Sequence, residues 1–174
     1  MQNLFPRLLG AIGVHAVLGA LLWALTRYVL IVQSGLSSDL LTRTDGDPAR
    51  IEVYLRDIEG DVLTAGVGAM VVSAVLAIVW LVLVHRYPPY GDRSARSRRN
   101  GWAALLLLAL ATTAGLFWWK VIEGATAALL APGLGTKVAL VATALVLLAY
   151  WLSTAWFSPA ASRIAVPGAQ LISR

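Results

Sequence analysis

Four ionisable residues lie inside or beside long apolar stretches of this chain, and they are the first candidates for chemistry: His15, Arg27, Lys120 and Glu123. An ionisable group at membrane depth is costly, and such groups often form proton relays or ion pathways. His15 could relay protons. It could equally be a neutral imidazole bonded to a backbone carbonyl, Thr112 or Thr113. We expect the second role, which would serve helix packing.

Lys120 and Glu123 follow Trp118 and Trp119 at the end of an apolar run. Tryptophan is enriched where a membrane meets water, and charged side chains beside it are solvated there. The alternative is a charged pair in a water-lined cavity that forms part of a conduit. We expect both residues at the interface.

Metal and cofactor sites have little support in the sequence. His15 lies about seven residues inside the first apolar run, whereas His85 lies at the end of the second, so the two imidazoles differ in depth and do not suit one haem iron. Asp45, Asp47 and Glu52 could bind Ca²⁺, but they lack the spacing of an EF-hand loop. The chain has no cysteine to bind a metal. We therefore expect no cofactor and no metal.

One acidic motif resembles that of an enzyme family. The segment Asp45-Gly46-Asp47-Pro48-Ala49-Arg50, followed after nine residues by Gly60, resembles the opening of the CDP-alcohol phosphotransferase signature. The resemblance implies carboxylates that hold a divalent metal and activate a hydroxyl. The family pattern continues with two aspartates at four-residue steps, where this chain has Thr64 and Gly68. Without those carboxylates the metal and the base are missing, and we expect no enzyme.

Four apolar runs must position any such residues, and none contains Asp, Glu, Lys or Arg. They are Leu8 to Leu25, Val62 to Val84, Trp102 to Trp119 and Val138 to Phe157. Crossing a hydrocarbon core of about 30 Å takes about 20 helical residues. The sequence therefore predicts an all-α, multi-pass membrane protein. Its single domain, 1–157, has four transmembrane helices at about 8–32, 62–86, 102–122 and 137–157.

A cluster of arginines predicts the orientation of these helices. The cluster consists of Arg86, Arg93, Arg96, Arg98 and Arg99, with one acid, Asp92, among them. By the positive-inside rule the loop 87–101 is cytoplasmic, and so are both termini and the tail 158–174. We expect a bacterial inner membrane, with anionic lipid headgroups rather than nucleic acid against the arginines. The tail is predicted to be loosely structured.

The predicted outer loop, 33–61, contains a short amphipathic helix. Asp47 can cap its first turn, which begins with Pro48. Its apolar face consists of Ile51, Tyr54, Leu55 and Ile58. Gly60 is expected to end this helix, and Asp61 to cap the next span.

Small residues recur every four positions in the first two spans. The stripes are Ala16, Ala20 and Ala24, and Ala65, Ala69, Ser73 and Ala77. Small side chains let membrane helices approach closely, so we expect both stripes to face other helices.

No motif specifies a chemistry, and the stripes, the amphipathic helix and the basic loop all suit docking. We therefore expect a non-catalytic membrane subunit that assembles with other integral membrane proteins, or with copies of itself, in a secretion, transport or respiratory complex. The alternative is a small oligomeric transporter or channel for ions, protons or small solutes, with the four ionisable residues near its pathway.

Overall fold

The structure is a computed structural model that describes residues 4–32, 42, 44, 45, 47–124, 130 and 133–169. Most of the predicted outer loop before Asp47 and the last five residues of the tail lie outside these residues. Every regular element in the described part of the chain is helical.

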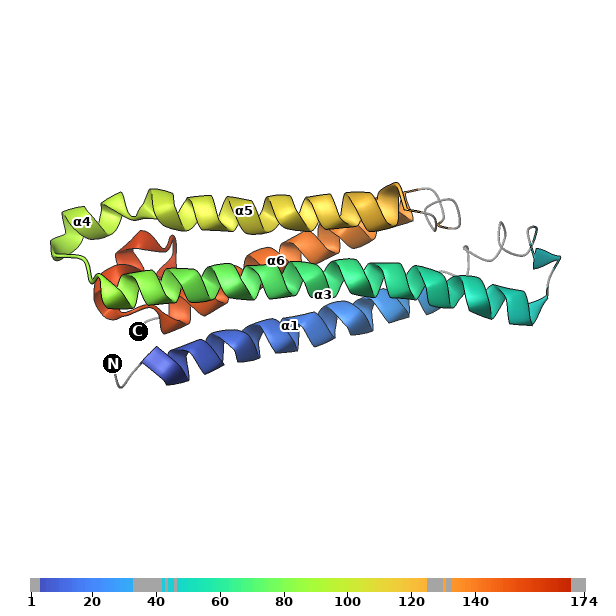
Figure 1. Cartoon of the computed structure of the whole chain (residues 1–174), viewed down its shortest axis with the longest axis horizontal. Helices are drawn as coiled ribbons and strands as arrows, with labels where there is room; N and C mark the ends of the chain where they lie inside the picture. The colour runs from blue at the N-terminus through green and yellow to red at the C-terminus, as the bar shows by residue number, and fades with distance from the viewer. Residues whose placement is uncertain are drawn as a thin grey trace.

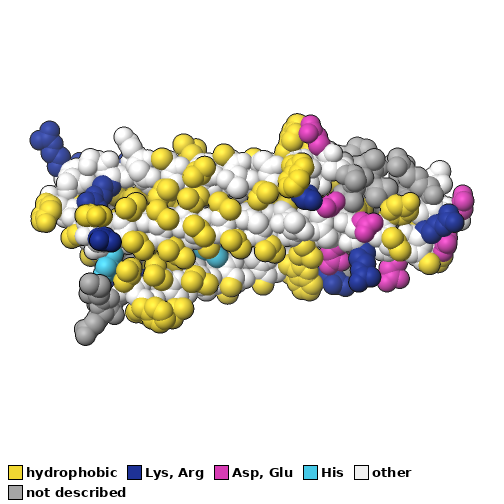
Figure 2. Space-filling view, viewed as in Figure 1, with side chains coloured by type: hydrophobic (Ala, Val, Ile, Leu, Met, Phe, Trp, Pro, Cys, Tyr) yellow, Lys and Arg dark blue, Asp and Glu magenta, His cyan; other side chains and the backbone are white. Residues whose placement is uncertain are grey.

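Four long helices run side by side and alternate in direction (Figure 1). They are α1 (Leu4–Val32), α3 (Pro48–Arg86), α5 (Arg99–Phe117) and α6 (Leu134–Phe157), and α5 continues as the π-helix η1 (Trp118–Ile122). Each is long and apolar enough to cross a membrane, which confirms the prediction of an all-helical chain with four helices able to span one. Figure 2 shows apolar side chains over the middle of the bundle and charged side chains towards its two ends.

Helix α3 spans 39 residues, which corresponds to about 58 Å and is nearly twice the hydrocarbon thickness. Its first turns project beyond the other helices (Figure 1). The predicted break at Gly60 and Asp61 is wrong, because α3 continues through both residues. Ile58, Val62 and Ala65 are all buried on one helix face, so packing of that face continues across the glycine and outweighs its cost of about 1 kcal/mol.

The residues of the predicted outer helix form the first three turns of α3. Ile58 is fully buried, and Tyr54 and Leu55 pack against the hydrophobic core of the bundle. Ile51, one turn earlier, is half-buried. Asp47 is the N-cap of α3, and its Oδ1 atom accepts a hydrogen bond of 3.0 Å from the backbone N–H of Ala49. The apolar face therefore packs against this chain, at least from Tyr54 onward.

The short helix α4 (Gly91–Ser97) and the 3₁₀-helix η3 (Ala160–Ala165) lie together at the opposite end from the projecting turns of α3. The prediction of a loosely structured tail is wrong as far as residue 169. Ala165, Val166 and Ala169 are buried in a cluster with residues of α3, α5 and α6. The Trp151 indole N–H also donates a 2.7 Å hydrogen bond to the Pro167 carbonyl. The tail packs because burying its apolar side chains against the helix ends is favoured in free energy over leaving them exposed to water.

Candidate functional site

A polar cluster joins three helices in the middle of the bundle. His15 of α1 is 4% exposed, and its Nδ1 atom lies 2.9 Å from the carbonyl oxygen of Ala11. Its Nε2 atom lies 3.0 Å from the Oγ atom of Ser73 on α3. The Oγ atom of Ser153, on α6, lies 3.2 Å from Nδ1 and 3.4 Å from the same carbonyl oxygen.

These distances assign the protons of the cluster. A carbonyl oxygen only accepts, so His15 Nδ1 must carry a hydrogen and donate it to Ala11. In a neutral imidazole Nε2 then accepts the Ser73 hydroxyl hydrogen, while the Ser153 hydroxyl can donate to the Ala11 carbonyl. Both ring nitrogens of a neutral imidazole are satisfied in this arrangement. Such a cluster holds three helices in register without burying a charge.

The sequence predicted part of this arrangement. His15 does bond to a backbone carbonyl, but Thr112 and Thr113 are not its partners, because they donate to the Leu108 and Ala109 carbonyls of their own helix. Ser153 was missed. A serine hydroxyl inside an otherwise apolar run indicates that Ser153 needs a polar partner. Only the packing of α6 against α1 identifies that partner as His15.

The two stripes of small residues differ in their surroundings. Those of α3 are fully buried in the bundle: Ala65, Ala69, Ser73 and Ala77. Those of α1, namely Ala16, Ala20 and Ala24, are exposed in this chain, so the expectation that the α1 stripe faces another helix stays a prediction that concerns a partner. The rotation of α1 explains the difference. The side of α1 that carries His15 and its hydrogen bond to Ser73 faces inward, and residues of the α1 stripe lie about 100° or more around the helix from it.

A groove of about 350 Å³ lies between α1 and α3. Small residues on both helices leave this space, among them Ala16 and Gly19 of α1 and Gly66 and Ala74 of α3. The remaining walls are almost entirely apolar. His15 lies at the end of the groove towards the middle of the bundle, which we call the deep end. Trp23 and Thr26 lie at the other end, nearest the acidic turns of α3.

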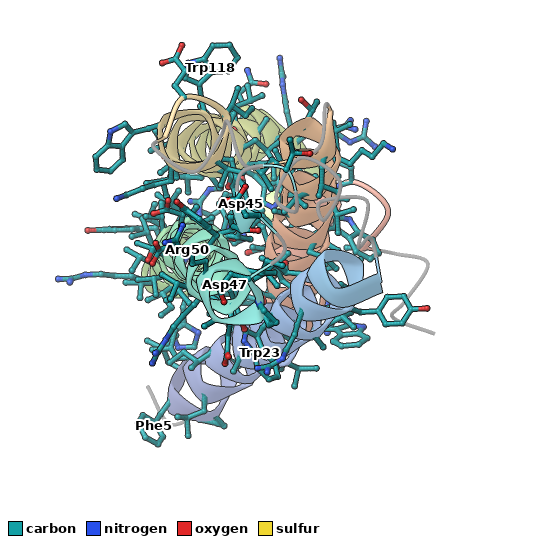
Figure 3. All side chains as sticks on the ribbon, turned by 90° about the vertical axis from the view of Figure 1, so that its right-hand side faces the viewer. Phe5, Trp23, Asp45, Asp47, Arg50 and Trp118 are labelled. Carbon is teal, nitrogen blue, oxygen red and sulfur yellow. The ribbon has the colours of Figure 1, made fainter. Side chains whose placement is uncertain are left out.

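The polar end of this groove carries an ion pair. Arg27 lies 3.5 Å from Glu59, measured between Nη1 and Oε1, and its guanidinium carbon lies 5.6 Å from the centre of the Trp23 ring. The Arg27 side chain remains 53% exposed, so most of its donors are free to meet solvent or a ligand. Figure 3 looks along the bundle from this end and labels Trp23, Arg50 and Asp47, the N-cap of α3.

Lys120 and Glu123 do not pair with each other in the described part of the chain. The Lys120 Nζ atom lies 4.6 Å from the centre of the Trp119 ring, and Glu123 is exposed. Trp118 and Trp119 are also exposed, and Trp118 points away from the bundle (Figure 3). Neither charged residue lines the groove between α1 and α3.

The acidic motif has a structural explanation. Asp47 caps α3 and lies 3.6 Å from Arg50, while the Thr64 hydroxyl donates to the Gly60 carbonyl of its own helix. No three His, Asp or Glu side chains among the described residues come close enough together to hold a metal ion.

The arginine cluster lies at the other end of the bundle, around α4. Arg86, Arg93, Arg96 and Arg99 are exposed. Arg98 donates to the Tyr87 carbonyl and so ties the start of α5 to the end of α3.

Comparison with protein-family models, curated proteins and solved structures found no significant match to this chain.

Proposed function

We propose that this chain is a non-catalytic subunit of a larger membrane complex for secretion, transport or respiration, and that the outward face of α1 contacts its partner. We place it in a bacterial inner membrane, with the arginine cluster and both termini in the cytoplasm, because arginine-rich loops remain on that side. The buried polar groups around His15 bond to one another, which suits a structural role better than turnover.

The exposed stripe on α1 is the observation that carries the proposal. Ala20 and Ala24 lie on the side of α1 away from its buried residues, Ala16 borders the groove, and a Cβ atom added at Gly13 would meet no other atom within 4 Å. Apolar burial gives no driving force between helices in lipid, so close backbone approach over small residues favours their association. A flat helix face of this kind, left uncovered by its own chain, suits a helix of another protein.

Co-purification tests the proposal. The chain, tagged at native expression level, is extracted in a mild detergent beside the variant Ala20→Trp, which places a bulky side chain on the stripe. We expect a second membrane protein to elute with the wild type in a fixed ratio and to be lost from the variant. Wild-type protein that elutes only as a monomer would remove the support for a subunit role.

The alternative proposal is a small oligomeric transporter or channel. A histidine and two serines in the middle of the membrane favour it, because such groups can pass protons or coordinate ions. Within one chain these groups are already satisfied, so a pathway would form between copies. Reconstituted protein should then show flux that His15→Ala abolishes, and flux unchanged by that variant would reject this alternative.

A further inference from the structure

We propose that the groove between α1 and α3 binds one hydrocarbon chain of an anionic phospholipid, with the phosphate at Arg27. The groove lies along the membrane-spanning part of both helices. Its lining on α1 runs from Ile12 to Thr26, a rise of about 20 Å, which is slightly more than the roughly 15 Å depth of one leaflet's hydrocarbon. It therefore reaches from the membrane surface to about the bilayer centre.

The volume of the groove suits a single hydrocarbon chain. Spread over about 20 Å, the volume of 350 Å³ gives a mean cross-section of about 18 Å². A single file of carbon atoms with contact distances of about 4 Å needs about 16 Å². The groove therefore has room for a hydrocarbon chain along its length.

The distribution of polar groups shows which end of the ligand lies where. At the deep end His15 has both ring nitrogens engaged by Ala11 and Ser73, so it offers no hydrogen bond to a polar ligand group. Only an apolar tail suits that end. A soluble polar metabolite does not fit, because it would lose its hydration there without compensation.

The shallow end offers polar contacts. Thr26 is 4% exposed and lines the groove, and among the described residues no hydrogen bond to its hydroxyl is present. Arg27, one residue further, uses Nη1 for Glu59 and leaves its other guanidinium donors free. The Arg27 guanidinium lies at the level of Trp23, where a lipid phosphate is expected, and can bind it. The Thr26 hydroxyl lies where it can donate a hydrogen bond to an acyl ester oxygen.

Native mass spectrometry of the purified full chain tests this site with phosphatidylglycerol and with phosphatidylcholine of the same acyl chains. Gly19→Phe fills the groove midway, since a Cβ at Gly19 would lie 3.7 Å from Met70 Cγ, an ordinary contact. Gly115→Phe is the matched control on α5, where a Cβ meets nothing within 4 Å. We expect one retained phosphatidylglycerol in the wild type and control, and about tenfold weaker retention in Gly19→Phe.

A second groove variant, Val67→Trp, keeps the test valid if Gly19→Phe fails to fold. Val67 lines the groove and its side chain is 60% exposed, so a larger residue there can be accommodated. Arg27→Gln should reduce the preference for phosphatidylglycerol over phosphatidylcholine about fivefold, the equivalent of about 1 kcal/mol for one arginine at a charged headgroup. Wild-type retention in both groove variants would overturn the site, and an unchanged preference in Arg27→Gln would overturn the phosphate contact. Loss of a partner protein from the groove variants, with lipid retained, would show that a helix covers the groove instead.

Discussion

The Nε2 atom of His15 lies 3.0 Å from the Oγ atom of Ser73, so a hydrogen bond joins α1 to α3 in the middle of the membrane-spanning bundle. This bond lies on the buried side of α1, together with Ala11, Leu22 and Thr26. With His15 turned inward, Ala20 is exposed on the outside of the bundle, and the groove beside Gly19 opens between the two helices. The rotation that buries His15 with Ala11, Leu22 and Thr26 therefore leaves the other surfaces of α1 open to lipid and to other chains.

We expect His15 and Ser73 to be energetically coupled. His15→Leu and Ser73→Ala each remove one partner of the bond and should each destabilise the fold by about 1 to 2 kcal/mol. A double-mutant cycle, measured by reversible unfolding of the detergent-solubilised protein, should give a coupling of about 1 kcal/mol. Thr112→Ala, whose hydroxyl bonds only to its own helix, should show no coupling to His15→Leu. Strictly additive effects of His15→Leu and Ser73→Ala would contradict the contact.

The two stripes should respond oppositely to enlargement. Ala69 is fully buried between helices, so Ala69→Leu forces neighbouring backbones apart and should cost about 2 kcal/mol. Ala20→Leu makes the same chemical change on the exposed side of α1 and should leave the stability of the isolated chain within about 0.5 kcal/mol of the wild type. Unfolding midpoints of the two purified variants measure the difference, and a larger loss for Ala20→Leu would show that α1 is rotated otherwise.

The folded part of the tail depends on an indole hydrogen bond. Trp151→Phe removes the donor to the Pro167 carbonyl and should loosen η3 by about 1 kcal/mol. Limited proteolysis of the purified protein should then cleave the tail faster than in the wild type. Trp156→Phe is the control, because that ring is 47% exposed and its indole makes no bond within the described residues. Equal cleavage rates for the two variants would mean that the tail is held by apolar packing alone.

The sequence predicts the membrane-spanning helices because length and apolar composition decide them almost alone. It also predicts the cap at Asp47, since a carboxylate before Pro48 has a local role. Contacts distant in sequence were not predictable in this way. Ser153 lies 138 residues from His15, and no local pattern indicates that the two meet. The continuity of α3 through Gly60 likewise depends on a core that only the assembled bundle supplies.

The orientation of the chain in the membrane can be measured by labelling single introduced cysteines, because the chain contains no native cysteine. Single cysteines in place of Ser94, beside the arginine cluster, and of Ala160 or Ala161 in the tail should be protected from an impermeant maleimide added to intact cells. A cysteine in place of Arg50, at the opposite end, should be modified. Our proposed orientation fails if the Ser94 and Arg50 positions exchange these reactivities.

Site-specific photocrosslinking at native expression level tests the subunit role most directly. A photoreactive phenylalanine derivative replaces Ala20 on the outward face of α1 or Leu107, which is 65% exposed on α5 at the opposite side of the bundle (Figure 1). We predict one discrete crosslinked product with a different membrane protein from position 20 and none from position 107. Products from neither position, or equal products from both, would contradict a partner on α1.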